Sequence, residues 1–109
     1  MIATPDGGHI HFEQETQADL FAIIPERVAR DDRISGNALR IYCALLIEGK
    51  RAQYRGGPGY PGQDALGELY GMSGRNVRRG LNELIEAQYI STERVGLGRP
   101  DNITIHRLP

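Results

Sequence analysis

The hydrophobic and polar positions of this chain follow a helical period through the middle of the sequence and alternate near its end. The first helical stripe recurs every three or four residues and consists of Ala38, Ile41, Tyr42, Leu45 and Leu46. Ser35 stands before this stripe, where its hydroxyl can accept a hydrogen bond from a free amide of the first turn. Gly49 follows the stripe and is expected to end the helix. The pattern therefore predicts a core helix between these two residues.

Residues 63–87 carry a second helical pattern, which a turn divides into two short helices. The first helix is predicted from Gln63 to Tyr70, and its apolar stripe consists of Leu66, Leu69 and Tyr70. Gly71 can adopt the left-handed backbone conformation that a sharp turn between helices requires. Ser73 is expected to cap the second helix. The apolar side of that helix consists of Val77, Leu81, Leu84 and Ile85.

The polar side of the second helix carries the candidate binding residues. At about 100° per residue, the positions that face away from the apolar side are Arg75, Asn76, Arg79 and Asn82. Arginine can donate a pair of hydrogen bonds to guanine and asparagine can pair similarly with adenine, so these four are candidate base readers. Arg78 on the flank and Ser73 at the helix start are candidate contacts to the DNA backbone. The free amides and positive dipole of a helix start also favour phosphate.

An ordinary solvated helix face is the alternative interpretation of these residues. In that case Arg79 would pair with Glu83, or Arg75 with Glu86. The first turns, however, carry three arginines and no acid. This is the reverse of what the helix dipole prefers for stability alone, and it favours a binding role.

Alternation resumes after this helix and predicts a hairpin. Residues 88–95 and 103–108 read as strands, and the turn-rich residues 96–102 join them. Arg94 and Arg99 lie near the tip, from which they would project toward the DNA backbone or an adjacent minor groove. The residues expected to face the helices are Ile90, Ile103 and Ile105.

Residues 49–62 are rich in glycine and proline and are predicted to be a loop. The loop carries three cations, Lys50, Arg51 and Arg55, for which contact with phosphates and plain solvation are both open. Its Gly-Gly-Pro run lacks the glycine spacing and the Lys-Ser/Thr pair of a nucleotide-binding loop. No nucleotide or other cofactor is therefore expected.

Composition narrows the function classes. A chain of 109 residues with 39% hydrophobic and 25% charged residues is about one globular domain. The net charge is -1, yet residues 1–34 carry seven acids and three bases, whereas residues 73–109 carry four acids and six bases. The acidic N-terminal third is interpreted as a surface for a protein partner or a second copy of the chain.

Few other residues suggest chemistry. Cys43 is the single cysteine, which excludes an internal disulfide and a multi-cysteine zinc site. His9 and His11 could share one face of a short strand, but without further ligands they are interpreted as exposed polar residues, not a metal site. No signal peptide is visible and no apolar stretch reaches the roughly 20 residues that span a bilayer. We expect a cytoplasmic or nucleoid-associated protein.

Three segments carry a resemblance to a known family: SGNALRIYCALL, YPGQDALGELYGMSGRNVRRGLNELIEAQYI and STERVGLGRPDNITI. With them, residues 24–108 resemble a bacterial winged helix-turn-helix domain, most closely those at the N-termini of phage and plasmid replication initiators, and more widely small transcriptional regulators. The resemblance implies a mainly α fold with a three-helix core and a β-hairpin wing over residues 21–109, preceded by an arm or partner-contact segment over residues 1–20. It also implies that a homodimer binds double-stranded DNA through the helix after Ser73 and through the wing.

Three glycines depart from the pattern of the resembled family. Gly62 replaces the usual Ser or Thr cap, Gly67 replaces alanine, and Gly80 lies inside the second helix, where it costs about 1 kcal/mol relative to alanine. These glycines indicate either looser helices or close backbone contacts.

The expected function is sequence-specific binding of double-stranded DNA, as a transcriptional regulator or as a plasmid or phage replication or partition initiator. The alternative is a winged helix that binds an acidic protein partner within a DNA-processing complex. An enzyme is the weakest interpretation, because Glu83, Glu86 and His106 are accompanied by no nucleophile and base.

Overall fold

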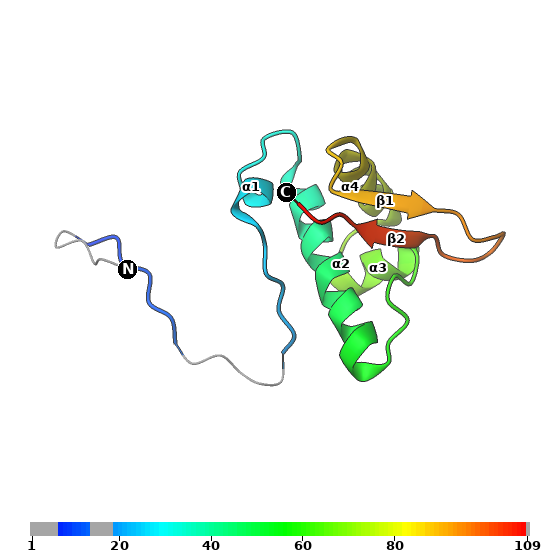
Figure 1. Cartoon of the computed structure of the whole chain (residues 1–109), viewed down its shortest axis with the longest axis horizontal. Helices are drawn as coiled ribbons and strands as arrows, with labels where there is room; N and C mark the ends of the chain where they lie inside the picture. Colours follow the sequence, from blue (N-terminus) through cyan, green and yellow to red (C-terminus); the bar gives the residue numbers. More distant parts are fainter. Residues whose placement is uncertain (1–6, 14–18, 109) are drawn as a thin grey trace.

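The computed structural model describes residues 7–13 and 19–108 of the chain. The elements within them are α1 (Glu26–Ala29), α2 (Gly36–Arg55), α3 (Gln63–Tyr70), α4 (Gly74–Glu86), β1 (Ile90–Glu93) and β2 (Asn102–Ile105). Figure 1 shows α2 at the centre, with α3, α4 and the hairpin on one side and the segment leading to α1 on the other. This arrangement confirms the predicted winged helix-turn-helix fold, with its mainly helical core and small hairpin.

Helix α2 is longer than predicted. It begins after Ser35, whose hydroxyl oxygen accepts a hydrogen bond of 3.1 Å from the amide of Ala38, as expected of an N-cap. The prediction that Gly49 ends the helix is wrong, because α2 continues to Arg55 and is ended by Gly56 with a left-handed φ of 77°. A glycine inside a helix costs only about 1 kcal/mol, which two further turns of helix can offset.

The turn between α3 and α4 is tight and depends on two glycines. Gly71 adopts the predicted left-handed conformation, with φ of 69°. The carbonyl of Gly67 accepts a hydrogen bond of 2.8 Å from the amide of Met72. A Cβ atom on Gly67 would collide with the carbonyl oxygen of Met72 and lie 3.3 Å from Cγ2 of Val77. Gly67 therefore reflects a close backbone contact, not a loose helix.

Gly80 provides a second close contact, where α4 packs on α2. A Cβ atom at this position would collide with Cδ1 of Ile41 and lie 3.3 Å from Cα of Ala38. The two backbones approach one another because Gly80 has no side chain. The core around this contact includes Val28, Tyr42, Leu45, Leu66, Val77, Leu81, Leu84 and Ile90.

Two residues predicted to be buried are exposed. Leu69 on α3 is 63% exposed and Ile85 on α4 is 37% exposed. Helix α3 has only eight residues and packs mainly on α4 through Leu66 and Gly67, so the apolar residue on its other side has no neighbour to cover it. Tyr70 is half-buried, and its hydroxyl donates a hydrogen bond of 2.7 Å to the carboxylate of Glu48.

The hairpin is shorter than predicted but packs as expected. Strands β1 and β2 are antiparallel, with Ile90 opposite Ile105 and Thr92 opposite Ile103. Ile90 is fully buried, and the two β2 isoleucines are half-buried against the same core. Of the residues predicted to extend the two strands, 88 and 89 lie between α4 and β1, 94 and 95 lie in the connecting loop, and 106–108 lie beyond β2. Asn102, predicted in the turn, is the first residue of β2.

A polar cluster ties the turn before α2 to the junction of α4 and β1. The guanidinium of Arg33 donates to the carboxylate of Asp31, with a shortest distance of 2.6 Å, and the Tyr89 hydroxyl donates to the same carboxylate. These hydrogen bonds hold the pKa of Asp31 well below its usual value, and the bond from Arg33 has the largest effect. The bond to Asp31 in turn raises the pKa of Tyr89.

The N-terminal segment contacts the far side of α2. Residues 7–13 form neither helix nor strand, so the short strand considered around His9 and His11 is absent there, and residues 1–6 and 14–18 lie outside the described part. An extended segment from Phe21 leads into α1. The ammonium of Lys50 donates a hydrogen bond of 3.0 Å to the carbonyl of Phe21 and lies 5.0 Å from the centre of its ring.

The described residues contain neither a cluster of metal ligands nor a membrane-spanning helix. Among residues 7–13 and 19–108, no three His, Cys, Asp or Glu side chains gather where they could hold a metal ion. None of the helices in this part of the chain is long and apolar enough to cross a membrane.

Candidate nucleic-acid interface

The outer face of α4 presents the predicted arginines to solvent. Arg75, Arg78, Arg79 and Asn82 are exposed. Within the described residues, none of the three arginines forms an ion pair. They surround a shallow hollow of about 420 Å³ that Asn82, Glu83 and Glu86 also line. This face therefore offers three unpaired guanidinium groups to an anionic partner.

The start of α4 is capped by Ser73. Ser73 is exposed, and its hydroxyl oxygen accepts a hydrogen bond of 3.1 Å from the amide of Asn76. A hydroxyl that accepts in this way keeps its proton for donation, so the same group can cap the helix and contact a phosphate oxygen. Asn76 itself is half-buried, in contrast to the other three residues predicted to read bases.

Glu83 has a partner that the sequence did not indicate. Its carboxylate accepts hydrogen bonds from the backbone amide of Ser35 at 2.6 Å and from the Ser35 hydroxyl at 2.9 Å. The alternative pairing of Glu83 with Arg79 does not form in the described part of the chain. No local spacing links residues 35 and 83, so only the packing of α4 on α2 reveals this contact.

The wing lies beside the start of the helix-turn-helix. A Cβ atom on Gly62, the N-cap residue just before α3, would lie 3.8 Å from Cγ of Pro100 in the hairpin loop. At the same end of α3, the carboxylate of Asp64 lies against Gly74, the first residue of α4. Residues 60–65 and residues 98–101 line a common hollow of about 450 Å³. The hairpin loop and the starts of α3 and α4 therefore form one continuous end of the molecule.

The electrostatics of this end are mixed. Burial, followed by the nearby carboxylates of Asp101 and Asp64, raises the pKa of Tyr60. The predicted wing residues Arg94 and Arg99 are exposed, and neither forms an ion pair within the described residues. The acids thus lie at the base of the wing, and a cation lies at each end of its loop.

The cations of α2 are placed differently from those of α4. Lys50 donates a hydrogen bond to the carbonyl of Phe21, in the segment that leads to α1. Arg51 pairs with Glu48 at 3.5 Å, and Arg55 lies in the last turn of the helix. They were predicted on a loop and lie on a helix, and their contact with a DNA backbone stays a prediction.

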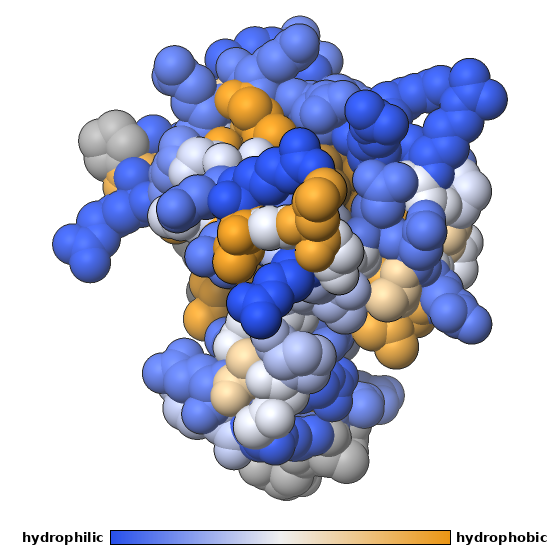
Figure 2. Space-filling view, turned by 90° about the vertical axis from the view of Figure 1, so that its right-hand side faces the viewer, coloured by the Kyte–Doolittle hydropathy of each residue, from blue (hydrophilic) through white to orange (hydrophobic). Residues whose placement is uncertain are grey.

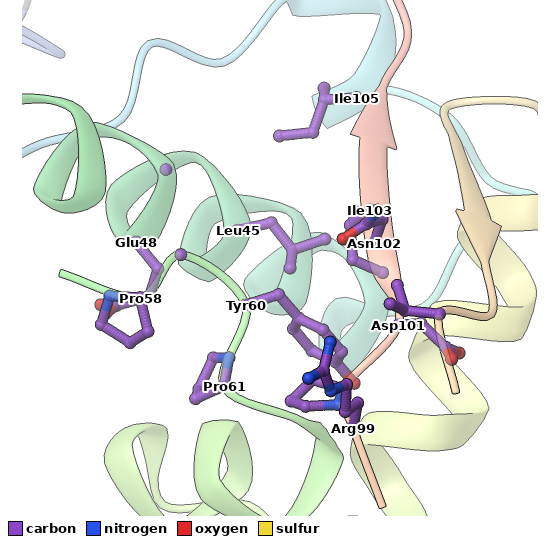
Figure 3. A pocket seen from close by; sticks show the side chains of 14 residues that line it. Leu45, Glu48, Pro58, Tyr60, Pro61, Arg99, Asp101, Asn102, Ile103 and Ile105 are labelled. Atoms are coloured by element: carbon purple, nitrogen blue, oxygen red, sulfur yellow. The ribbon is translucent and has the colours of Figure 1, made fainter. Parts of the chain in front are cut away.

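A larger hollow of about 690 Å³ lies between α2, residues 58–61 and the wing. Figure 3 shows Leu45 on α2 and Ile103 on β2 turned toward one another, with Tyr60 beside them. Glu48 also lines this space, but its carboxylate is engaged by Tyr70 and Arg51. His106, one of the three acid–base candidates of the sequence, lies outside this lining and has its Nδ1 atom 2.7 Å from the carbonyl of Gln88.

Comparison with known proteins supports this geometry. A family model described as a helix-turn-helix domain matches residues 32–90, which is more than half of the chain. The match runs from the turn before α2 to the first residue of β1 and so contains the whole of α3 and α4. No curated protein and no solved structure gives a significant match to the chain.

Proposed function

We propose that this chain reads a specific duplex sequence through α4. The chain belongs to the family of helix-turn-helix domains, and this membership implies DNA binding. Arg75, Arg79 and Asn82, together with the half-buried Asn76, contact base edges in the major groove. The observation that carries the proposal is the face of α4, which holds three exposed arginines unpaired within the described residues.

The remaining contacts of the proposal position the protein on the duplex. Ser73 and Arg78 contact phosphates beside the groove that α4 enters, aided by the free amides of the helix start. Arg94 and Arg99 on the wing add a second contact. Their support is the continuity of the hairpin loop with the starts of α3 and α4.

The biological role that we propose is regulation of transcription or initiation of plasmid or phage replication or partition, at the nucleoid. The support is the resemblance of residues 24–108 to the domains that perform these tasks. We propose a homodimer on a palindromic site, because two copies of one recognition helix read inverted half-sites.

The first test is selection of bound sites from a random duplex library. Arg75→Ala or Arg79→Ala should relax the selected sequence at one position and weaken binding to the selected site by about 1–3 kcal/mol. Arg99→Ala should weaken binding to all duplexes alike and reduce the slope of log affinity against log salt by about 1. A palindromic selected site would support the dimer.

Arg30→Ala is the matched control. Arg30 is an exposed arginine that pairs with Glu26 on α1 at 3.6 Å, across α2 from the wing, and its loss removes the same charge. This variant should bind as the wild type does. If Arg75→Ala, Arg79→Ala and Arg99→Ala also leave duplex affinity unchanged at low salt, the proposal is wrong and the face binds another partner.

A further inference from the structure

The tip of the wing carries an apolar side chain, that of Leu97, which the fold leaves uncovered. Leu97 is 89% exposed and Val95 is 47% exposed, although the isoleucines of the same hairpin pack on the core. Leu97 stands between two glycines, and Gly98 has a left-handed φ of 73° that a turn requires. Figure 2 faces the wing and shows apolar side chains at the centre of this face, between strongly hydrophilic ones.

The surroundings of these side chains favour DNA as their partner. Arg94 precedes them and Arg99 follows them, so a cation stands at each end of the apolar tip. Pro100 of this loop lies beside Gly62 at the start of α3, and the carboxylate of Asp64 at the same end of α3 lies beside the start of α4. A duplex bound along α4 would therefore lie next to the wing loop from which Leu97 projects.

The shape of the tip also argues against an ordinary protein contact. A surface that docks another protein presents a broad patch with an apolar centre. Here one apolar side chain, that of Leu97, projects from a narrow two-stranded loop between two arginines, whereas Val95 also lines the hollow between the wing and α2. A narrow apolar projection between cations fits a groove with phosphates on both walls.

We propose that Leu97 enters the minor groove and wedges into a base step, which it partly unstacks so that the duplex kinks away from the wing. The inference rests on the proposed function, because α4 must bring the wing to the duplex. Minor-groove proteins use leucine and similar residues as wedges, which bend the DNA by about 20–90°. Arg94 and Arg99 hold the phosphates on each side while the side chain enters.

The experiment uses the duplex selected from the random library, labelled at its ends with a donor and an acceptor dye. Binding of the wild-type chain should shorten the end-to-end distance, and a fluorescent adenine analogue in the site should brighten at the unstacked step. Leu97→Ala should abolish both signals, whereas Leu97→Met should keep them. Because Leu97→Ala removes no charge, the salt dependence of binding should not change.

Ile23→Ala is the matched control, since Ile23 is another exposed apolar residue at 74% exposure and lies in the N-terminal segment. It should bend the duplex as the wild type does. Both leucine variants should melt at the wild-type temperature, because residue 97 contributes nothing to the core.

The other outcomes each overturn a defined claim. A wild-type chain that binds the selected duplex without bending it, or a Leu97→Ala variant that bends it equally, refutes the wedge and leaves sequence reading by α4 intact. Loss of a DNA-free dimer in Leu97→Ala, measured by sedimentation, would assign the side chain to a second copy and also refute the wedge. A library that yields no bound duplex refutes the proposed function itself.

Discussion

Replacement of Gly67 by alanine should destabilise the fold even though alanine is the better helix former. Gly67 lies inside α3, and a Cβ atom there would sit well under 3.0 Å from the backbone carbonyl oxygen of Met72. The obstacle is backbone within a tight turn, so it cannot rotate away as a flexible side chain could. The methyl group would also lie 3.3 Å from Cγ2 of Val77, so it could not shift away from the carbonyl toward α4.

The magnitude follows from three terms. Overpacking of this kind costs about 1–3 kcal/mol. Movement of the turn would also weaken the 2.8 Å hydrogen bond from the Met72 amide to the Gly67 carbonyl, worth about 1 kcal/mol. The better helix propensity of alanine offsets about 1 kcal/mol of this. The net loss of stability is about 1–3 kcal/mol, which corresponds to at least about 4 °C in melting temperature.

The matched control is Gly49→Ala in α2. Gly49 is an exposed helical glycine with nothing within 4 Å of the position of its Cβ, so alanine should stabilise the fold by about 0.5–1 kcal/mol. Urea unfolding followed by far-ultraviolet circular dichroism measures both variants, whose midpoints should move in opposite directions at constant slope. If Gly67→Ala raises the midpoint as Gly49→Ala does, the close approach of the turn to α3 is refuted.

Three further predictions concern polar contacts. The pKa of Asp31 is depressed in the fold, so the stability that Asp31 contributes is present above the ordinary pKa of 3.8 and is lost as the pH falls below that value. Melting temperatures measured over a pH series should therefore show Asp31→Asn less stable than wild type at pH 7, with the difference narrowing below about pH 3.8. Glu83→Gln should lower the free energy of unfolding by about 1 kcal/mol, because it weakens the charge-assisted bonds to the start of α2, while Glu86→Gln should change it little; equal effects in urea unfolding would contradict this. Tyr70→Phe should lower the free energy of unfolding by about 1–3 kcal/mol, because Glu48, which is only 7% exposed, loses a hydrogen-bond donor. An unchanged midpoint in urea unfolding would show that water replaces the hydroxyl.

The elements that the sequence predicted well are those with local signals. Ser35 and Ser73 both accept hydrogen bonds as N-caps, and Gly71 adopts the left-handed turn. The buried side of α4 follows the predicted spacing at Val77 and Leu81, and the arginine face opposite it is exposed as predicted. Capping and helical period act over a few residues, so they can be read from the sequence before any tertiary contact is known.

The errors lie where distant contacts decide the outcome. Gly49 and Gly56 both carry a helix-ending signal, and the sequence did not show which of them ends α2. Leu69 has the spacing of a core residue, but α3 is too short to meet a second neighbour on that side. The roles predicted for the site residues remain predictions, because placement on an exposed face is not contact with DNA.

The bond between Glu83 and Ser35 fixes the rotation of α4 about its own axis. A turn of α4 by one residue, about 100°, would carry the carboxylate away from both of its donors at the start of α2. The face that carries Arg75 and Arg79 is therefore held in one angular setting relative to the body of the domain. Adjustment to a groove of different width must come from movement of α2 and α4 as one rigid unit, and slow hydrogen exchange at the Ser35 amide would report that this unit stays intact on the duplex.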